Sequence, residues 1–333
     1  MKRTIVILLA LVLILSSLVA CGGQVQEAVE EAAPTVASAV EEAVEEAAEE
    51  PAEEPTAEPE PTAEPEPTEE PEPTAEPEPE MVEAEPGALN DGFATFLADM
   101  EAYNTIGLED LNLALAEDPP PFLLDVREPG ELEEKGHIEG AVNIPLREVA
   151  DNLQYLPSFD TPIVSYCGSG WRCTIALAIL EGMGWEDVKG LKGGSLGGWI
   201  EAGYPVVEGA AAEPLELNAV EVDPALAAAA QEALRNVPEG FGVITADDLN
   251  LALAENPDLI LVDVRRDDEV AEKGVIETEN LSHIPLEEFI AEMDQWPAEK
   301  DAPIVTYCGS GHRSTIARAI MWANGYSDVR SLK

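Results

Sequence analysis

The sequence predicts an α/β fold: two tandem domains of one α/β/α architecture, each a mostly parallel sheet flanked by helices, behind an acidic stalk. Apolar runs of strand length alternate with helical patterns, as in parallel sheets covered by helices. This alternation occurs twice, roughly 140 residues apart, which indicates a duplicated domain. The first quarter of the 333-residue chain is dominated by Glu, Ala, Pro and Thr and has almost no aromatic residues, which predicts a separate, disordered segment.

The elements of the first unit follow from its periodicity. Strands are expected at residues 122–126, 141–144, 163–166 and 188–191. Helices are expected at residues 131–135, 147–156 and 174–183, and another precedes the unit at 93–103. The second unit repeats this order, with helices expected at 224–235 and 315–323. In such sheets, ligands bind at the carboxyl ends of the strands.

The repeated segments set the domain boundaries. Residues 110–117 recur as 248–255, residues 122–127 as 260–265, and residues 187–192 as 328–333. We place domain 1 at residues 89–208 and domain 2 at residues 215–333. The first unit continues past Lys192 into a turn and a helix over 193–206, whereas the second stops at Lys333. We therefore expect the C-terminal end of domain 2 to be incomplete.

One loop occurs in both units and carries the candidate chemistry. Its residues are Cys167, Gly168, Ser169, Gly170, Trp171 and Arg172 in the first unit, and Cys308, Gly309, Ser310, Gly311, His312 and Arg313 in the second. Each cysteine ends a predicted strand, and a predicted helix follows the loop. Glycines let backbone N–H groups converge, and the helix dipole adds to the anion nest they form. Such a nest favours the nucleophilic thiolate and can bind an anionic substrate.

A buried structural cysteine is the alternative interpretation of either loop, because free cysteine is often buried. The same spacing recurs in two otherwise diverged units, which favours a functional role. We therefore take Cys167 and Cys308 as candidate catalytic residues, and the five loop residues after each of them as candidate substrate-binding residues.

The pattern Cys-x-x-x-x-Arg-[Ser/Thr] between a strand and a helix resembles the active-site loop of the rhodanese sulfurtransferases. Residues 125–132 and 136–146 resemble a second signature of that family, and the likeness covers about residues 105–205 and 245–333. The resemblance implies that Cys167 and Cys308 attack a sulfur donor such as thiosulfate and form a persulfide. It also implies that the sulfur passes to a thiophilic acceptor such as cyanide or a thiol. Arg172 and Arg313 would complete the anion cradle. No cofactor is implied.

Two other interpretations of the function of this loop remain open. Phosphatases and arsenate reductases of the same fold resemble a Cys-x5-Arg pattern, and the four intervening residues here favour a smaller sulfur substrate. The chain would otherwise be a persulfide or redox carrier with little free turnover, or an interaction module of this fold. Retained cysteine and arginine in both loops argue against a module whose cysteines are vestigial.

Cys173 occupies the Ser/Thr position of the loop pattern, where the second unit has Ser314. It is either a small substitute at the start of the helix or a thiol that resolves a persulfide or sulfenate on Cys167 as a disulfide.

The other polar candidates are assigned structural roles. The pairs Asp125–Arg127 and Asp263–Arg265 are expected to fix loops as ion pairs. His137 has no counterpart in the second unit, and His283 is expected to be solvated or in the core. His312 adds charge or a hydrogen bond to its loop, or it occupies a plain surface position. Three scattered histidines without a Cys-x-x-Cys pair predict no metal site.

The N-terminal residues predict export and anchoring. Residues 1–21 have a basic start, an apolar core and small residues, as in a signal peptide. The segment ending in Cys21-Gly22 resembles the lipobox of bacterial lipoproteins, which implies lipidation of Cys21; an uncleaved anchor is the alternative. We expect a membrane-anchored protein on the extracytoplasmic face of the cell envelope, with residues 22–88 as a linker. The net charge of -51 argues against nucleic acid as a partner.

Overall fold

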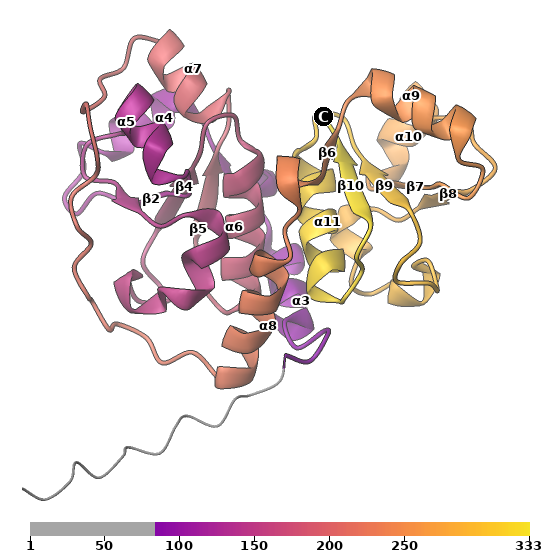
Figure 1. Cartoon of the computed structure of the whole chain (residues 1–333), viewed down its shortest axis with the longest axis horizontal. Helices are drawn as coiled ribbons and strands as arrows, with labels where there is room; N and C mark the ends of the chain where they lie inside the picture. Colours follow the sequence, from indigo (N-terminus) through magenta and orange to yellow (C-terminus); the bar gives the residue numbers. More distant parts are fainter. Residues whose placement is uncertain (1–83) are drawn as a thin grey trace, which may run out of the picture. The chain divides into compact units, whose positions relative to one another are not determined.

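Each repeat folds around a five-stranded parallel sheet in the structure, a computed structural model that describes residues 84–333 (Figure 1). The first sheet has the order β1-β5-β4-β2-β3 and the second the order β6-β10-β9-β7-β8. The first comprises β1 (Thr105–Ile106), β2 (Phe122–Asp125), β3 (Val142–Asn143), β4 (Ile163–Tyr166) and β5 (Val188–Leu191). The second comprises β6 (Val243–Ile244), β7 (Ile260–Asp263), β8 (Leu281–His283), β9 (Ile304–Tyr307) and β10 (Val329–Leu332). The identical order confirms the predicted fold class and its duplication.

The central strands are apolar because both of their faces are covered. All four residues of β4 and all four of β9 are buried. In the first sheet, β4 pairs with β2 from Phe122↔Ile163 to Asp125↔Tyr166, and with β5 from Ile163↔Val188 to Ser165↔Gly190. The edge strands β1 and β3 are two residues long, which leaves little unpaired backbone at the edges.

Helices cover both sheets (Figure 1). The first repeat has α3 (Asn90–Asp99), α4 (Leu108–Ala114), α5 (Pro129–Lys135), α6 (Trp171–Gly182) and α7 (Ser195–Glu201). The second has α8 (Pro224–Arg235), α9 (Ala246–Glu255), α10 (Asp267–Lys273) and α11 (His312–Ala323). Short 3-10 turns connect them: η1 (Ala102–Asn104), η2 (Leu146–Asp151), η3 (Leu153–Tyr155), η4 (Glu239–Gly242), η5 (Leu286–Glu288) and η6 (Met293–Gln295).

Several element predictions need correction. The α-helix expected at 147–156 is two 3-10 turns, η2 and η3, and the strand expected at 141–144 is only Val142–Asn143. The helix expected at 93–103 begins at Asn90 and ends at Asp99. The strands β1 and β6 were not predicted, because a two-residue strand has no period to recognise.

The start of α6 matters most for the site. The helix begins at Trp171, directly after Gly170, and not at Thr174. Gly170 has φ 113°, a conformation that glycine adopts without steric cost, so the chain can turn sharply from loop to helix. Gly311 does the same before α11 with φ 85°. Arg172 and Cys173 therefore lie in the first turn of a helix, where their positions relative to the loop are fixed.

A shared hydrophobic core joins the two repeats. Helices α6 and α11 pack against each other, and one cluster of buried residues includes Ile175 and Leu180 of α6 and Ile316 and Ile320 of α11. The described residues all belong to one compact unit of the chain.

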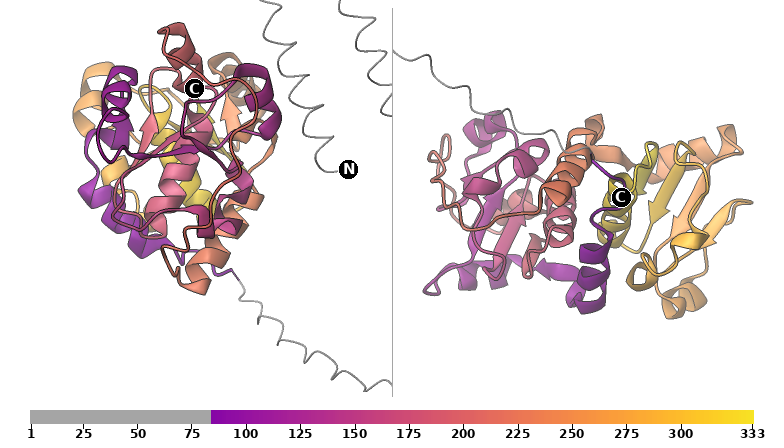
Figure 2. Two further views of the ribbon diagram at one scale, coloured as in Figure 1. Left: turned by 90° about the vertical axis from the view of Figure 1, so that its left-hand side faces the viewer. Right: turned by 90° about the horizontal axis from the view of Figure 1, so that it is seen from below.

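The segments that precede the two repeats each contact both repeats (Figures 1 and 2). We call residues 90–106 and 224–244 the lead-in segments of the first and second repeat. Helix α3 of the first lead-in packs on α6 and also on η5 of the second repeat. Helix α8 of the second lead-in packs on α11 and also on η2 of the first repeat. Each lead-in segment therefore contacts the body of the other repeat.

The predicted signal peptide, Cys21 and most of the predicted linker lie outside the described residues. Across residues 84–333, no helix has both the length and the apolar character needed to cross a membrane.

Candidate active site

The two cysteine loops lie at the carboxyl ends of the central strands. Cys167 directly follows β4 and Cys308 directly follows β9. The N–H of Gly170 donates to the Cys167 Sγ at 3.1 Å, and the N–H of Gly311 donates to the Cys308 Sγ at 3.1 Å. The two loops thus present a backbone donor to sulfur in the same way.

The surroundings of Cys167 favour its thiolate form. Its burial opposes ionisation, but hydrogen bonds from the Cys173 side chain and from the backbone of Cys173, Ser169 and Gly170 outweigh it and lower the pKa of Cys167 to about 5. The hydrogen bond to Cys167, together with burial, raises the pKa of Cys173 well above its ordinary value. The pair therefore holds one proton near neutral pH, on Cys173. Both thiols are free, so the linkage between them stays a prediction.

Helix α7 supports the first loop from behind. The Cys167 N–H donates to the Ser195 Oγ at 2.8 Å. The Leu196 N–H donates to the Cys167 carbonyl at 3.0 Å, and the Gly197 N–H donates to the Gly168 carbonyl at 3.2 Å. Sequence reasoning missed Ser195, although the turn Gly193-Gly194 marked this segment. The second loop has no such support from the described residues, and Cys308 is half-buried where Cys167 is 1% exposed.

The loop arginines are paired with carboxylates. Arg172 binds Glu131 through both terminal nitrogens, with Nη2 to Oε1 at 2.7 Å. Arg313 binds Glu269 in the same way, also with 2.7 Å between Nη2 and Oε1. The hydrogen bond from Arg313 lowers the pKa of Glu269 to about 2. The arginine charge that the sequence predicts for the cradle is thus balanced by a glutamate that the sequence analysis missed, although Glu131 and Glu269 occupy matching positions in the duplicated run.

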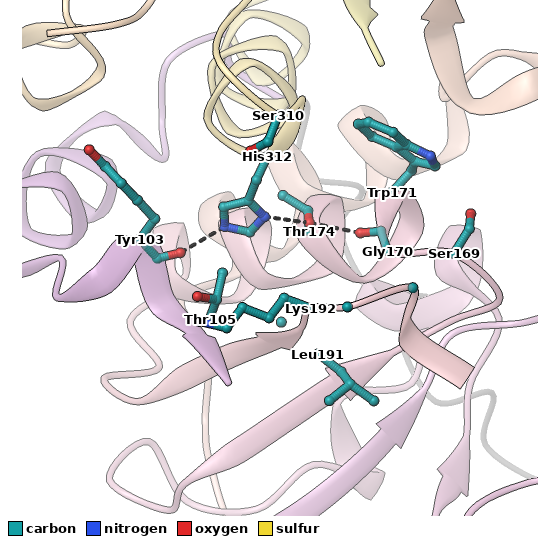
Figure 3. Close-up of a pocket in the computed structure, with 13 residues that line it drawn as sticks. Tyr103, Thr105, Ser169, Gly170, Trp171, Thr174, Leu191, Lys192, Ser310 and His312 are labelled. Carbon is teal, nitrogen blue, oxygen red and sulfur yellow. Dashed lines mark hydrogen bonds between the residues drawn. The ribbon is translucent and has the colours of Figure 1, made fainter. Parts of the chain in front are cut away.

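A pocket of about 320 Å³ lies between the two loops (Figure 3). Residues of both loops line it, together with side chains from outside the loops. The first loop contributes Ser169, Gly170 and Trp171, the second loop Ser310 and His312, and other segments Tyr103, Thr105 and Lys192. The loops touch beside it, because a Cβ on Gly311 would lie 2.2 Å from the Trp171 ring.

His312 is a hydrogen-bonding residue of this pocket. Its Nε2 donates to the Tyr103 carbonyl at 2.7 Å, and its Nδ1 lies 3.0 Å from the Thr174 Oγ1 (Figure 3). Burial lowers the pKa of His312, which favours the neutral ring. His312 therefore contributes hydrogen bonds to the pocket and not an added positive charge.

The rhodanese-like domain family matches residues 108–201 and 245–333, which is more than half of the chain. The chain belongs to the rhodanese-like family.

Curated relatives of this rhodanese-like chain include two of different kinds. Thiosulfate sulfurtransferase PspE of Escherichia coli is 33% identical over 104 residues, which cover 30% of this chain and 94% of the relative. An HTH-type transcriptional regulator of Mycobacterium tuberculosis is 46% identical over 91 residues, which cover 26% of this chain but only 38% of the regulator. Among solved structures, a 3-mercaptopyruvate sulfurtransferase, SseA of Escherichia coli, is 21% identical, with 69% of this chain and 97% of that chain covered and a TM-score of 0.32.

The remaining charged candidates form a structural ion pair within each rhodanese-like repeat. Arg127 and Asp125 form a buried ion pair, and Arg127 Nη2 also donates to the Gly136 carbonyl at 2.9 Å. Arg265 and Asp263 repeat this pair in the second repeat. These groups fix the turn after the strand and do not contact the cysteine.

The histidines outside the loops are also structural. His137 Nδ1 lies 3.2 Å from the Gly209 carbonyl. His283 Nε2 lies 2.8 Å from the Arg265 carbonyl, and in the first repeat Asn143 donates to the matching Arg127 carbonyl at 2.8 Å. His283 therefore takes the place of an amide. No cluster of His, Cys, Asp or Glu within residues 84–333 could hold a metal ion.

Proposed function

We propose that the chain is a rhodanese-type sulfurtransferase that carries sulfane sulfur as a persulfide, primarily on Cys167. The observation that carries this proposal is the Cys167 sulfur, which accepts the Gly170 N–H and whose pKa is lowered to about 5. A thiol with this pKa is a thiolate at neutral pH without any external base. The family membership and the sulfurtransferase among the relatives support the same chemistry.

In the first step, the Cys167 thiolate attacks the outer sulfur of thiosulfate. A sulfur–sulfur bond forms to Cys167, the bond inside thiosulfate breaks, and sulfite leaves with its electron pair. The negative charge then resides on the outer persulfide sulfur. The backbone donors of the loop stabilise this charge, so one nest serves both the resting thiolate and the intermediate.

In the second step, a thiophilic acceptor such as cyanide attacks the outer sulfur. The persulfide bond breaks, thiocyanate leaves, and Cys167 returns to the thiolate. No cofactor or external oxidant is needed, because the transferred sulfur brings its own oxidation state. Covalent carriage replaces one difficult transfer by two easier displacements.

Thiosulfate is proposed as the donor class for two reasons. The relative that is covered over 94% of its length is named as a thiosulfate sulfurtransferase. Four residues separate Cys167 from Arg172, and the loop arginine is already paired with Glu131. In phosphatase or arsenate chemistry the loop would enclose a whole tetrahedral oxyanion, whereas in sulfur transfer it would hold only the transferred sulfur atom. The short loop therefore favours sulfur transfer.

The proposed location is the extracytoplasmic face of a membrane, with Cys21 lipidated. It rests on the sequence of residues 1–22. Mass spectrometry of the N-terminal peptide from membrane fractions tests it. A lipid-modified Cys21 supports the proposal, and an unmodified N-terminus in the soluble fraction contradicts it.

The activity is tested by thiocyanate formation from thiosulfate and cyanide. The full chain is compared with the Cys167→Ser and Cys308→Ser variants and with the double variant. We expect loss of most activity in Cys167→Ser, partial loss in Cys308→Ser and none remaining in the double variant. Activity that remains in the double variant would contradict the proposal. If the wild type forms no thiocyanate but still gains the mass of one sulfur atom on Cys167, the chain is a persulfide carrier and not an enzyme that turns over free thiosulfate.

A further inference from the structure

We propose that each active site is completed by an aromatic side chain from the lead-in segment of the other repeat. Tyr103, from the first lead-in, is a positioning residue for Arg313 in the second site. Phe241, from the second lead-in, is a positioning residue for Arg172 in the first site. The inference rests on the proposed function only in treating the two cysteine loops as active sites.

In both sites the arginine of one repeat contacts an aromatic ring of the other repeat, an arrangement that we call the crossing. The Arg313 guanidinium lies over the Tyr103 ring, 4.8 Å from its centroid. The Arg172 guanidinium lies over the Phe241 ring, 5.0 Å from its centroid. Both distances are within the range in which the face of an aromatic ring attracts a cation. In both cases, the ring and the arginine belong to different repeats.

Both rings are presented by the same rare backbone conformation. Tyr103 is the middle of three consecutive left-handed residues, with φ 48°, 57° and 47° at Ala102, Tyr103 and Asn104. Phe241 is the middle of another such run, with φ 71°, 55° and 62° at 240–242. Non-glycine residues seldom adopt this conformation, and such strain persists where the surroundings hold it. Its occurrence at matching places in both repeats indicates that both turns serve to aim the ring.

The ring and the glutamate together confine the arginine. Glu131 takes both terminal nitrogens of Arg172, while the Phe241 ring covers one face of the guanidinium. Arg172 is 9% exposed and Arg313 is 7% exposed. The arginine lies against the loop, because a Cβ on Gly168 would be 3.4 Å from Arg172 Nη2. Although the glutamate balances part of its charge, the arginine is held beside the cysteine sulfur of its loop and attracts the thiolate form.

The two aromatic rings differ by one hydroxyl. The Tyr103 hydroxyl accepts hydrogen bonds from Arg266 and, at 3.3 Å, from Arg313 Nη1. Phe241 has no hydroxyl, and a second guanidinium, Arg147, lies 5.2 Å from its ring centroid. The second site therefore links its arginine to the other repeat by a hydrogen bond as well as by stacking.

The crossing is tested by residue-resolved alkylation of the full chain. Iodoacetamide modifies thiolates, and peptide mass spectrometry follows Cys167 and Cys308 separately across a pH series. The variants are Tyr103→Ala and Phe241→Ala. The control is Tyr155→Ala, which removes a half-buried ring of the first repeat that has no arginine over it.

Tyr103→Ala is expected to raise the midpoint of the Cys308 profile by about 0.5 to 1 pH unit, a roughly threefold to tenfold change in the ionisation constant, and to leave Cys167 unchanged. Phe241→Ala is expected to raise the midpoint of the Cys167 profile by a similar amount and to leave Cys308 unchanged. Tyr155→Ala should move neither profile. Tyr103→Phe should give a smaller shift at Cys308 alone, because it keeps the ring and removes the hydroxyl.

A shift at the cysteine of the substituted residue's own repeat, or an equal shift at both cysteines, would overturn the proposal. If an alanine variant does not fold, Tyr103→Leu or Phe241→Leu keeps the apolar volume without the ring face, and the same crossed pattern is required. Alkylation needs no sulfur transfer. A crossed pattern in a chain without transferase activity would therefore refute only the proposed function, and activity without the crossing would refute only this inference.

Discussion

A buried thiolate is stable only where hydrogen-bond donors replace the water it has lost. At Cys167 the donors are the Gly170 N–H and the Cys173 thiol, which is kept protonated and whose proton is shared with the Gly170 carbonyl, 3.1 Å from the Cys173 Sγ. The second repeat uses a hydroxyl in this place, since the Cys308 Sγ lies 3.5 Å from the Ser314 Oγ. In both repeats the side chain at this helix position lies beside the sulfur and also donates to a loop carbonyl, that of Gly170 or Gly311.

This role of Cys173 can be tested by substitution. Cys173→Ala removes the donor and should move the midpoint of Cys167 ionisation upward from about 5 by about 1 to 2 pH units, the usual effect of a hydrogen bond to a charged group. Cys173→Ser keeps a donor and should stay close to the wild type. Thiolate absorbance across a pH titration measures both. An unchanged midpoint in the alanine variant would mean that the backbone alone lowers the pKa.

At the residue scale, the sequence identified the groups that repeat. The cysteines, the arginines and the glycines of the loops stand at equal spacing in both units, so comparison of the chain with itself picked them out. The partners Glu131 and Ser195 were missed because the fold brings them to the loop from 41 residues before Arg172 and 28 residues after Cys167. No local pattern records such a contact.

Helices α3 and α6 meet with backbone almost touching backbone. A Cβ on Gly92 of α3 would lie 2.1 Å from the Gly182 carbonyl of α6. A Cβ on Gly182 would lie 2.5 Å from the Phe93 ring. The two glycines therefore set the depth at which the first lead-in helix is seated on its own repeat.

Gly92→Ala should destabilise the chain by about 1 to 3 kcal/mol, because the added methyl forces the helices apart. Gly130→Ala is the control: it also lies in a helix, nothing is within 4 Å of its Cβ, and alanine there should be neutral or stabilising by up to about 1 kcal/mol. Urea unfolding monitored by circular dichroism gives both values. A stabilised Gly92→Ala chain would show that the close approach is not required.

Prediction of elements succeeded where a local sequence signal marks the element and failed where tertiary packing or an unusual backbone conformation decides it. The helix expected at 224–235 has those bounds in the structure, and its first turn is marked by Asp223 and Pro224. The region 147–156 has apolar residues at helical spacing, but tertiary packing of η2 under α8 shapes it into 3-10 turns. The left-handed turn at Tyr103 replaced the last turn of an expected helix because no glycine there signalled it.

At the scale of the whole molecule, the lead-in segments make the repeats interdependent, because each of them contacts both repeats. Ala230 and Leu234 of α8 are buried, and Arg147 of the first repeat donates to the Val237 carbonyl at the end of this helix. The cluster of buried residues that includes α6 and α11 continues through both lead-in helices. The sequence showed the duplication but not the contacts between the repeats, since helix patterns say which face is apolar and not which repeat covers it.

We expect the described region to unfold in one cooperative transition. Leu234→Ala should lower stability by about 2 to 4 kcal/mol and reduce hydrogen-exchange protection equally in β4 and β9, although Leu234 precedes only the second repeat. Leu251→Ala is the control, because Leu251 is 56% exposed on α9. Loss of protection confined to β9 would mean that the repeats unfold independently.

The chain enters the folded region through the second repeat. The Gly87 N–H donates to the Ala323 carbonyl at 3.2 Å, and the amides of Asn90 and Asn324 exchange hydrogen bonds of 3.0 and 2.8 Å. A force that pulls on the chain from its N-terminal side would therefore load the end of α11 and the seam between the repeats first. The first sheet, with the Cys167 loop at the carboxyl end of its central strand, would stay out of the line of tension.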